Sequence, residues 1–243
     1  MTTTTSIDIT TSTTTSTTVT STTTAPMKDN FIPAPNRAID PSKPMIALTF
    51  DDGPTGKNTL TILDLLTASG GRATFFNIGN SVEANSAAAK AIVAQGSQIA
   101  GHSWTHSDLT GLSSAEILSE MTRTRDVIKK VTGIDITMFR PPYGSSNANL
   151  LAVAKQVNEA AINWSIDSND WNGASVDQIY NNIINNANKN GAIVLCHENQ
   201  ANTPEAMKKV IPELAKTYQL VTVEELLYYS TKTISAGTLY NNK

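Results

Sequence analysis

Two adjacent aspartates are the first candidates for chemistry in this sequence. Asp51 and Asp52 follow the apolar run ALTF (47–50) and precede Gly-Pro. In the simplest interpretation both carboxylates face water beside an Asx-type turn, although such a turn uses only one side chain. A bound cation is the alternative, because it would offset the repulsion between the two negative charges. One aspartate could then bind the ion while the other acts as a general base.

All three histidines of the chain also follow β-rich runs. His102 and His106 are four residues apart in HSWTH, so their imidazoles could converge on one ion from a helical turn or a compact loop. This spacing alone is weak evidence. Together with one aspartate, however, the two histidines make a three-ligand set that leaves positions open for water and substrate. His197 ends the run GAIVLCH, where it either caps a strand or acts as a general acid.

The stretch RPPYG contributes a cation and a tyrosine. Arg140 directly precedes Pro141 and Pro142, where the backbone is stiff. A guanidinium fixed there could hold a carboxylate by paired hydrogen bonds, and the alternative is an ordinary surface charge. Tyr143 follows two residues that lack an N–H group. Its own backbone N–H could bind an oxyanion, or its ring could serve packing alone.

The stretch DSNDW adds two carboxylates and an indole. Asp170 could orient His197 and raise its pKa, and Asp167 is the alternative for this task. We expect Trp171 to lie half in the core and half on a substrate platform. Each of these stretches lies near the end of a β-rich run, so the elements that carry them decide whether they meet.

Seven β-rich runs alternate with segments of helical period. The predicted strands are 45–50, 73–78, 97–101, 136–139, 160–166, 191–196 and 218–223. The predicted helices are 57–68, 84–95, 113–133, 147–158, 175–189, 204–217 and 223–230. This succession implies a parallel sheet with helices outside it. A closed or nearly closed β/α barrel is our first choice and an open doubly wound sheet the second. In both, functional groups belong at the C-terminal ends of the strands.

The helix within 113–133 has the clearest pattern. Ser113 and Glu116 fit a capping box, and Gly133 fits a helix stop. One face of the helix collects these residues at helical spacing: Ile117, Met121, Thr124, Ile128 and Val131.

Composition limits the remaining possibilities. Of the first 24 residues, 15 are Thr and 4 are Ser, so this tract has little to bury and reads as a linker. We predict a linker and extended segment over 1–43, one catalytic domain over 44–230 and a tail over 231–243. The linker suggests a module of a larger secreted protein, with a monomer as the default state. Net charge is −3 without a basic cluster, which argues against nucleic acid, and no apolar run could span a membrane.

The motifs TFDDGP, HSWTH, RPPYG, SNDW and LCH, in this order, resemble the five motifs of the polysaccharide deacetylases of the NodB-homology type, carbohydrate esterase family 4. The likeness covers about 44–230. It implies a distorted (β/α)7 barrel in a metal-dependent enzyme that removes acetyl groups from sugars. It further implies that Asp51 is the base, that Arg140 positions it, and that the metal ligands are Asp52, His102 and His106.

The same resemblance gives tasks to the remaining motif residues. Tyr143 would supply an oxyanion-binding N–H, and Asp170 would tune His197 as the acid. An apolar, substrate-binding surface would come from Trp171, Leu195 and Pro142. We expect substrate preference to depart from relatives at Glu198 and in the loop before residue 203.

Three other protein classes fit less well. A glycoside hydrolase needs two carboxylates roughly 5 Å or more apart across a bond, and adjacent residues serve that poorly. A cysteine hydrolase built on Cys196 and His197 is disfavoured because neighbours on a strand point to opposite faces. A carbohydrate-binding domain without activity would lack a base or a ligand, and none is missing here.

The substrate and the metal stay open at this point. The linker slightly favours O-acetyl xylan, and polymers of N-acetylglucosamine, such as chitin or peptidoglycan, are the alternative. Zn²⁺ suits two histidines and an aspartate, while Co²⁺, Ni²⁺ and Mn²⁺ are possible.

Overall fold

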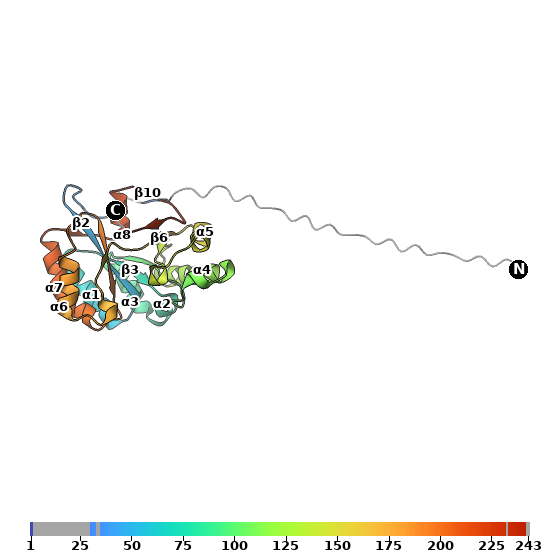
Figure 1. Cartoon of the computed structure of the whole chain (residues 1–243), viewed down its shortest axis with the longest axis horizontal. Coiled ribbons are helices and arrows are strands. Elements are labelled where there is room, and N and C mark those ends of the chain that lie inside the picture. Colours follow the sequence, from blue (N-terminus) through green and yellow to red (C-terminus); the bar gives the residue numbers. More distant parts are fainter. Residues whose placement is uncertain (2–29, 33–34, 232, 242–243) are drawn as a thin grey trace.

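The computed structural model describes residues 1, 30–32, 35–231 and 233–241, and Figure 1 shows a curled sheet surrounded by helices. The Thr/Ser tract, apart from Met1, lies outside the described residues. The main sheet consists of β2 (Met45–Gly53), β3 (Thr74–Asn77), β4 (Gln98–Gly101), β5 (Met138–Phe139), β6 (Ala160–Ile162), β7 (Ile166–Asp167), β8 (Ala192–His197), β9 (Gln219–Leu220) and β11 (Leu239–Tyr240). Its order is β11-β6-β5-β4-β3-β2-β8-β7, with β9 also on β2, and the pairings described are all parallel.

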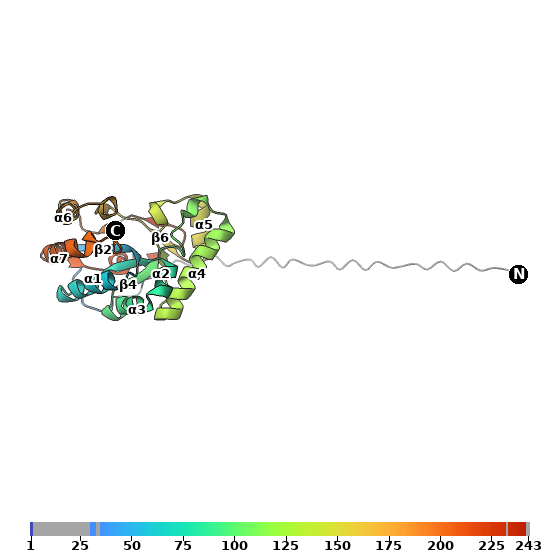
Figure 2. The same cartoon turned by 90° about the horizontal axis from the view of Figure 1, so that it is seen from below.

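Most of the helices follow one another around the outside of this sheet (Figure 2), and the last one packs on its inner face. They are α1 (Lys57–Ala68), α2 (Gly79–Ala84), α3 (Ser86–Gln95), α4 (Ser114–Thr132), α5 (Ala148–Gln156), α6 (Val176–Ile184), α7 (Asn202–Ala215) and α8 (Val223–Tyr228). Short 3-10 turns cover Leu109–Gly111, Pro142–Gly144 and Asp170–Asn172. None of the helices in the described part of the chain is long and apolar enough to cross a membrane.

The structure confirms a distorted (β/α)7 barrel and corrects two elements. The predicted helix 84–95 is two helices, α2 and α3, separated at Asn85. The predicted strand 160–166 is also two strands, β6 and β7, and these lie near opposite ends of the sheet. The barrel is therefore a curled half-barrel rather than a closed one. By contrast, α4 has the expected capping box of Ser113 and Glu116 and the expected left-handed Gly133.

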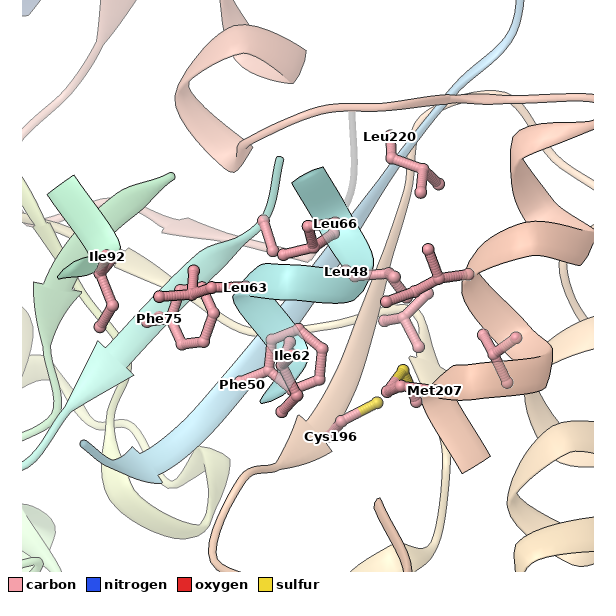
Figure 3. Close-up of a cluster of buried hydrophobic side chains, with 14 of the residues drawn as sticks. Leu48, Phe50, Ile62, Leu63, Leu66, Phe75, Ile92, Cys196, Met207 and Leu220 are labelled. Carbon is pink, nitrogen blue, oxygen red and sulfur yellow. The ribbon is translucent and has the colours of Figure 1, made fainter. Parts of the chain in front are cut away.

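Alternation along β2 divides the core into two clusters. Ile46, Leu48 and Phe50 point outward and pack against the helices, as Figure 3 shows for Leu48 and Phe50 with residues of α1. Met45 and Ala47 point inward, into a cluster that includes residues of α8. Both faces of the strand are thus buried, which explains its nearly continuous apolar sequence.

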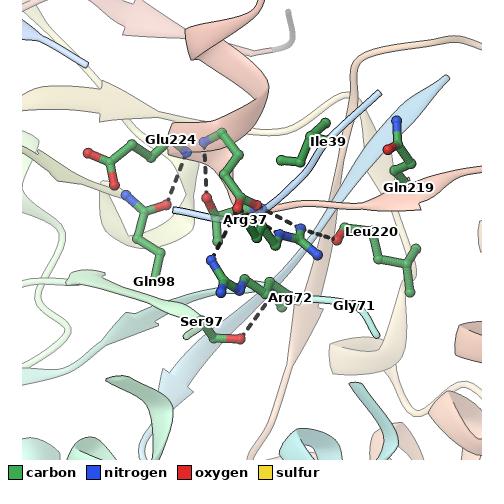
Figure 4. A network of polar contacts seen from close by, with 12 residues as sticks. Arg37, Ile39, Gly71, Arg72, Ser97, Gln98, Gln219, Leu220 and Glu224 are labelled. Carbon is green, nitrogen blue, oxygen red and sulfur yellow. Dashed lines mark hydrogen bonds and ion pairs between the residues drawn. The ribbon is translucent and has the colours of Figure 1, made fainter. Parts of the chain in front are cut away.

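Segments from both ends of the chain pack on the domain. β1 (Asn30–Phe31) pairs antiparallel with β10 (Thr233–Ile234), and β11 extends the main sheet beside β6. Arg37 donates two hydrogen bonds to Glu225, at 2.9 and 2.8 Å, and one to the carbonyl of Leu220. Arg72 reaches the same carboxylate at 3.3 Å, so the network in Figure 4 joins the N-terminal segment to the starts of the strands.

Candidate active site

Both aspartates reach one cavity because β2 is irregular at its end. Asp51 lies on the inner face by alternation, so a regular strand would point Asp52 the other way. The register against β3 shifts between Asp51 and Gly53, and Asp52 has a φ of 69°, in the left-handed region. This β-bulge turns the second carboxylate toward the cavity that the first one lines.

Asp52, His102 and His106 form a compact set of possible metal ligands, whose donor atoms lie within 4.8 Å of one another. Asp52 Oδ1 is 3.5 Å from His102 Nε2 and 3.3 Å from His106 Nε2. This oxygen is buried without a hydrogen-bond partner in the described part of the chain, as expected of an atom that binds a cation.

The second nitrogen of His102 fixes how its ring faces the other ligands. Nδ1 lies 2.7 Å from the carbonyl oxygen of Arg140, a contact that requires Nδ1 to donate, so Nε2 keeps its lone pair for an ion. Burial lowers the pKa of His102 to about 3, against the opposing charge of Asp52. The imidazole is therefore neutral near pH 7, which is the metal-binding form. This donor set fits a divalent cation.

Arg140 fixes the Asp51 carboxylate by a buried, hydrogen-bonded ion pair. Its side chain is fully buried, and Nη1 donates at 2.7 Å both to Asp51 Oδ1 and to Thr49 Oγ1. Nε donates to the carbonyl of Ile162 at 3.0 Å, so the guanidinium also links β2 to β6. Burial raises the pKa of Asp51 above its ordinary value, and the charges of Arg140 and His197 oppose that rise. Asp51 is thus a fixed carboxylate with increased basicity.

His197 and Asp170 form a second charged pair. His197 Nδ1 lies 2.8 Å from Asp170 Oδ1, and the backbone N–H of His197 donates to Oδ2 at 2.6 Å. Thr203 donates to the same oxygen at 2.6 Å. Burial favours the neutral imidazole, but the hydrogen bond to Asp170 and the negative charge of Asp51 outweigh it and raise the pKa of His197. This pair suits a proton donor.

A cavity of about 360 Å³ at the C-terminal ends of the strands joins these groups. Its lining residues are Asp51, Asp52, His102, His106, Pro141, Tyr143, Gly144, Trp164, Asp167, Trp171, Leu195 and His197. Tyr143 and Trp171 are exposed at 67% and 53% and stand at the mouth, where sugar rings could stack on them. Leu195 is buried in the wall.

The remaining predicted residues lie at defined places around this cavity. Tyr143 has a φ of 60°, in the left-handed region, and lines the cavity. Its ring packs against His106 with 4.8 Å between ring centres. Pro142 is buried and is not among the lining residues, whereas Pro141 is. Asp167 lines the cavity and bonds Asn169 and Trp171, which leaves Asp170 as the partner of His197.

Sequence reasoning missed some members of the site. Trp164 lines the cavity, with its ring 5.6 Å from the Arg140 guanidinium carbon. Asn199 donates to Asp52 Oδ2 at 3.1 Å. Glu198, which we expected to affect substrate preference, is fully buried under the end of β2 instead. No spacing in the sequence marks these residues, because each depends on how a loop folds back.

Fold and site together define a metal-dependent carbohydrate hydrolase built on a curled β/α barrel. The family model described as polysaccharide deacetylase matches residues 38–162, and the chain belongs to this family. As the resemblance implied, the relatives are carbohydrate esterase family 4 deacetylases.

The relatives act on different polymers, as their names state. The chain is 36% identical over 189 residues to the peptidoglycan-N-acetylmuramic acid deacetylase PdaC of Bacillus subtilis, covering 77% of this chain and 40% of the relative. It is 37% identical over 187 residues to a bifunctional xylanase/deacetylase of Pseudobutyrivibrio xylanivorans, covering 75% and 30%. The solved structure of PdaC matches with a TM-score of 0.76 at 35% identity, over 80% of this chain and 95% of that one. The chain spans about two fifths of the length of the first curated relatives.

Proposed function

We propose that this chain hydrolyses acetyl esters on xylan with Asp51 as base and His197 as acid. The observation that carries the proposal is the meeting of a three-ligand set, a buried carboxylate and a His–Asp pair in one cavity. Zn²⁺ is the proposed ion, held by Asp52, His102 and His106, because neutral imidazoles and one carboxylate are typical zinc ligands. When bound, the ion polarises water and the acetyl carbonyl.

The residues of the chain divide the remaining work. Asp51, fixed by Arg140, takes a proton from the attacking water. The Tyr143 N–H donates to the oxyanion of the tetrahedral intermediate. His197, oriented by Asp170, then gives a proton to the departing sugar oxygen. Leu195 and Trp171 supply apolar surface for the acetyl methyl group.

The preference for xylan rests on the Thr/Ser-rich tract and on the xylanase/deacetylase relative. The same residues could act on an N-acetyl group, and the peptidoglycan deacetylases among the relatives make N-acetylglucosamine polymers the second candidate. The peptidoglycan relatives also favour a role outside the cell, and their greater length favours a protein with further modules. A monomer stays the default expectation.

A measurement of acetate release tests the proposal. Acetylated xylan and an N-acetylglucosamine oligomer are assayed in parallel, each with and without a chelator. We expect release from xylan that stops on chelation and returns with Zn²⁺. Release from the amino sugar alone would overturn the choice of substrate. Release that is insensitive to the chelator would overturn the metal site.

A further inference from the structure

We propose that Glu198 and Asn199, the two residues after His197, are positioning residues for Asp52. The inference rests on the proposed metal-binding role of Asp52. The two residues act on different parts of Asp52: Asn199 holds the carboxylate group itself, and Glu198 supports the backbone that carries it.

Asn199 gives the two carboxylate oxygens of Asp52 different roles: one accepts a hydrogen bond, and the other stays available for the ion. Its side-chain amide donates to Asp52 Oδ2 at 3.1 Å, while Oδ1 faces His102 and His106 and has no hydrogen-bond partner in the described part of the chain. A donor on Oδ2 fixes the rotation of the carboxylate and leaves one oxygen for the ion. A neutral amide also adds no charge that would compete with a cation.

Glu198 occupies the space directly against Gly53. A Cβ atom on Gly53 would overlap the Glu198 carboxylate, so the two residues are complementary in shape. The carboxylate accepts hydrogen bonds from Thr59 of α1 and from Asn77 of β3, the latter at 3.3 Å. Glu198 therefore ties β8, α1 and β3 together under the end of β2.

The backbone at Asp52 has a conformation that depends on contacts from neighbouring residues. The left-handed region is strained for a residue other than glycine, and Asp52 has a φ of 69°. Its neighbours on both sides are held, because the Glu198 N–H donates to the Asp51 carbonyl at 3.2 Å and the Ile78 N–H to the Gly53 carbonyl at 3.0 Å. Without these contacts the bulge could relax and turn Asp52 away from the histidines.

The test titrates the metal-stripped chain with Zn²⁺ against a chromogenic chelator. Removing a partner of a metal ligand typically weakens metal binding 10- to 100-fold, and we expect a loss of this size for Asn199→Ala. Asn202→Ala is the matched control. Asn202 begins α7, three residues after Asn199, and the substitution removes one side-chain hydrogen bond, to the Ala174 carbonyl at 3.0 Å, but not one to Asp52. It should bind Zn²⁺ like the unchanged chain.

Glu198→Gln keeps the side-chain volume, so the domain should fold. Its amide nitrogen replaces one of the two oxygens that accept from Thr59 and Asn77, so the support under β2 is reduced and Zn²⁺ binding should weaken. Co²⁺ gives a second readout, because its visible absorption reports coordination geometry, and we expect the spectrum to change in both variants. At saturating Zn²⁺, Asn199→Ala should regain most of its activity. Equal Zn²⁺ affinity and an unchanged Co²⁺ spectrum for both variants would overturn the positioning role. Failure of the unchanged chain to bind either metal would instead overturn the proposed site, and this inference with it.

Discussion

Asp51 and Asp52 are neighbours in the chain with opposite surroundings. Asp51 is buried against Arg140, while Asp52 faces the imidazoles of His102 and His106. We expect Asp51→Asn to lower kcat/KM by about 10²- to 10⁴-fold, because a positioned general base contributes that much. Zn²⁺ affinity should stay within a few-fold of the unchanged chain. Asp52→Asn is the counterpart and should lose Zn²⁺ binding as well as turnover. Near-full activity of Asp51→Asn would show that another group takes the proton.

The pair of His197 and Asp170 predicts a pH dependence. The acid must be protonated, and its pKa is raised by Asp170, so activity should fall as the pH rises through this raised pKa. Asp170→Asn removes the charge that supports the imidazolium and should move the alkaline limb of the kcat profile to lower pH by about one unit or more. Asp167→Asn, which removes a carboxylate that does not contact His197, should leave the limb in place. Equal shifts in both variants would contradict the pairing.

At the scale of the element, the bulge at the end of β2 decides whether the two carboxylates share a cavity. Gly53→Ala places a methyl group against Glu198 and should destabilise the fold by about 1–3 kcal/mol through overpacking. Because the same change pushes on the bulge, we expect weaker Zn²⁺ binding too. Chemical denaturation and Zn²⁺ titration measure the two effects.

Gly111→Ala is the control for this substitution, since a Cβ at Gly111 meets no atom within 4 Å. It should change stability by less than about 0.5 kcal/mol. If Gly53→Ala behaved like Gly111→Ala in both measurements, the close fit between Gly53 and Glu198 would have no functional importance.

The limit of sequence reasoning also lies at this scale. Strand ends could be read from apolar runs, and alternation explains why Asp51 and His197 face inward while Cys196 packs in the outer core. The bulge that redirects Asp52 could not be predicted from the sequence, because it depends on contacts with β8 and β3. The division of 160–166 into β6 and β7 was missed for a similar reason. Its residues are β-rich throughout, and only the curl of the sheet places the two halves at opposite ends.

At the scale of the whole molecule, the site and the packed N-terminal segment lie at opposite ends of the strands. The catalytic groups follow the C-terminal ends, whereas Arg37 is held at the other end by Glu225 and by the carbonyls of Leu220 and Gly70. This separation predicts that the contacts of Arg37 affect stability without affecting the chemistry.

Arg37→Ala tests this separation. The substitution removes a two-point ion pair and leaves the Glu225 carboxylate, 7% exposed, with Arg72 at 3.3 Å as its remaining cationic partner. Hydrogen bonds to charged groups are worth about 2 kcal/mol, so Tm should fall by about 5 °C. Arg125→Ala removes an exposed contact of 3.4 Å to Asp126 and should have a much smaller effect. At temperatures well below Tm, both variants should keep the kcat of the unchanged chain. A loss of kcat in Arg37→Ala at such a temperature would mean that the two ends of the barrel are coupled and that the segment takes part in shaping the active site.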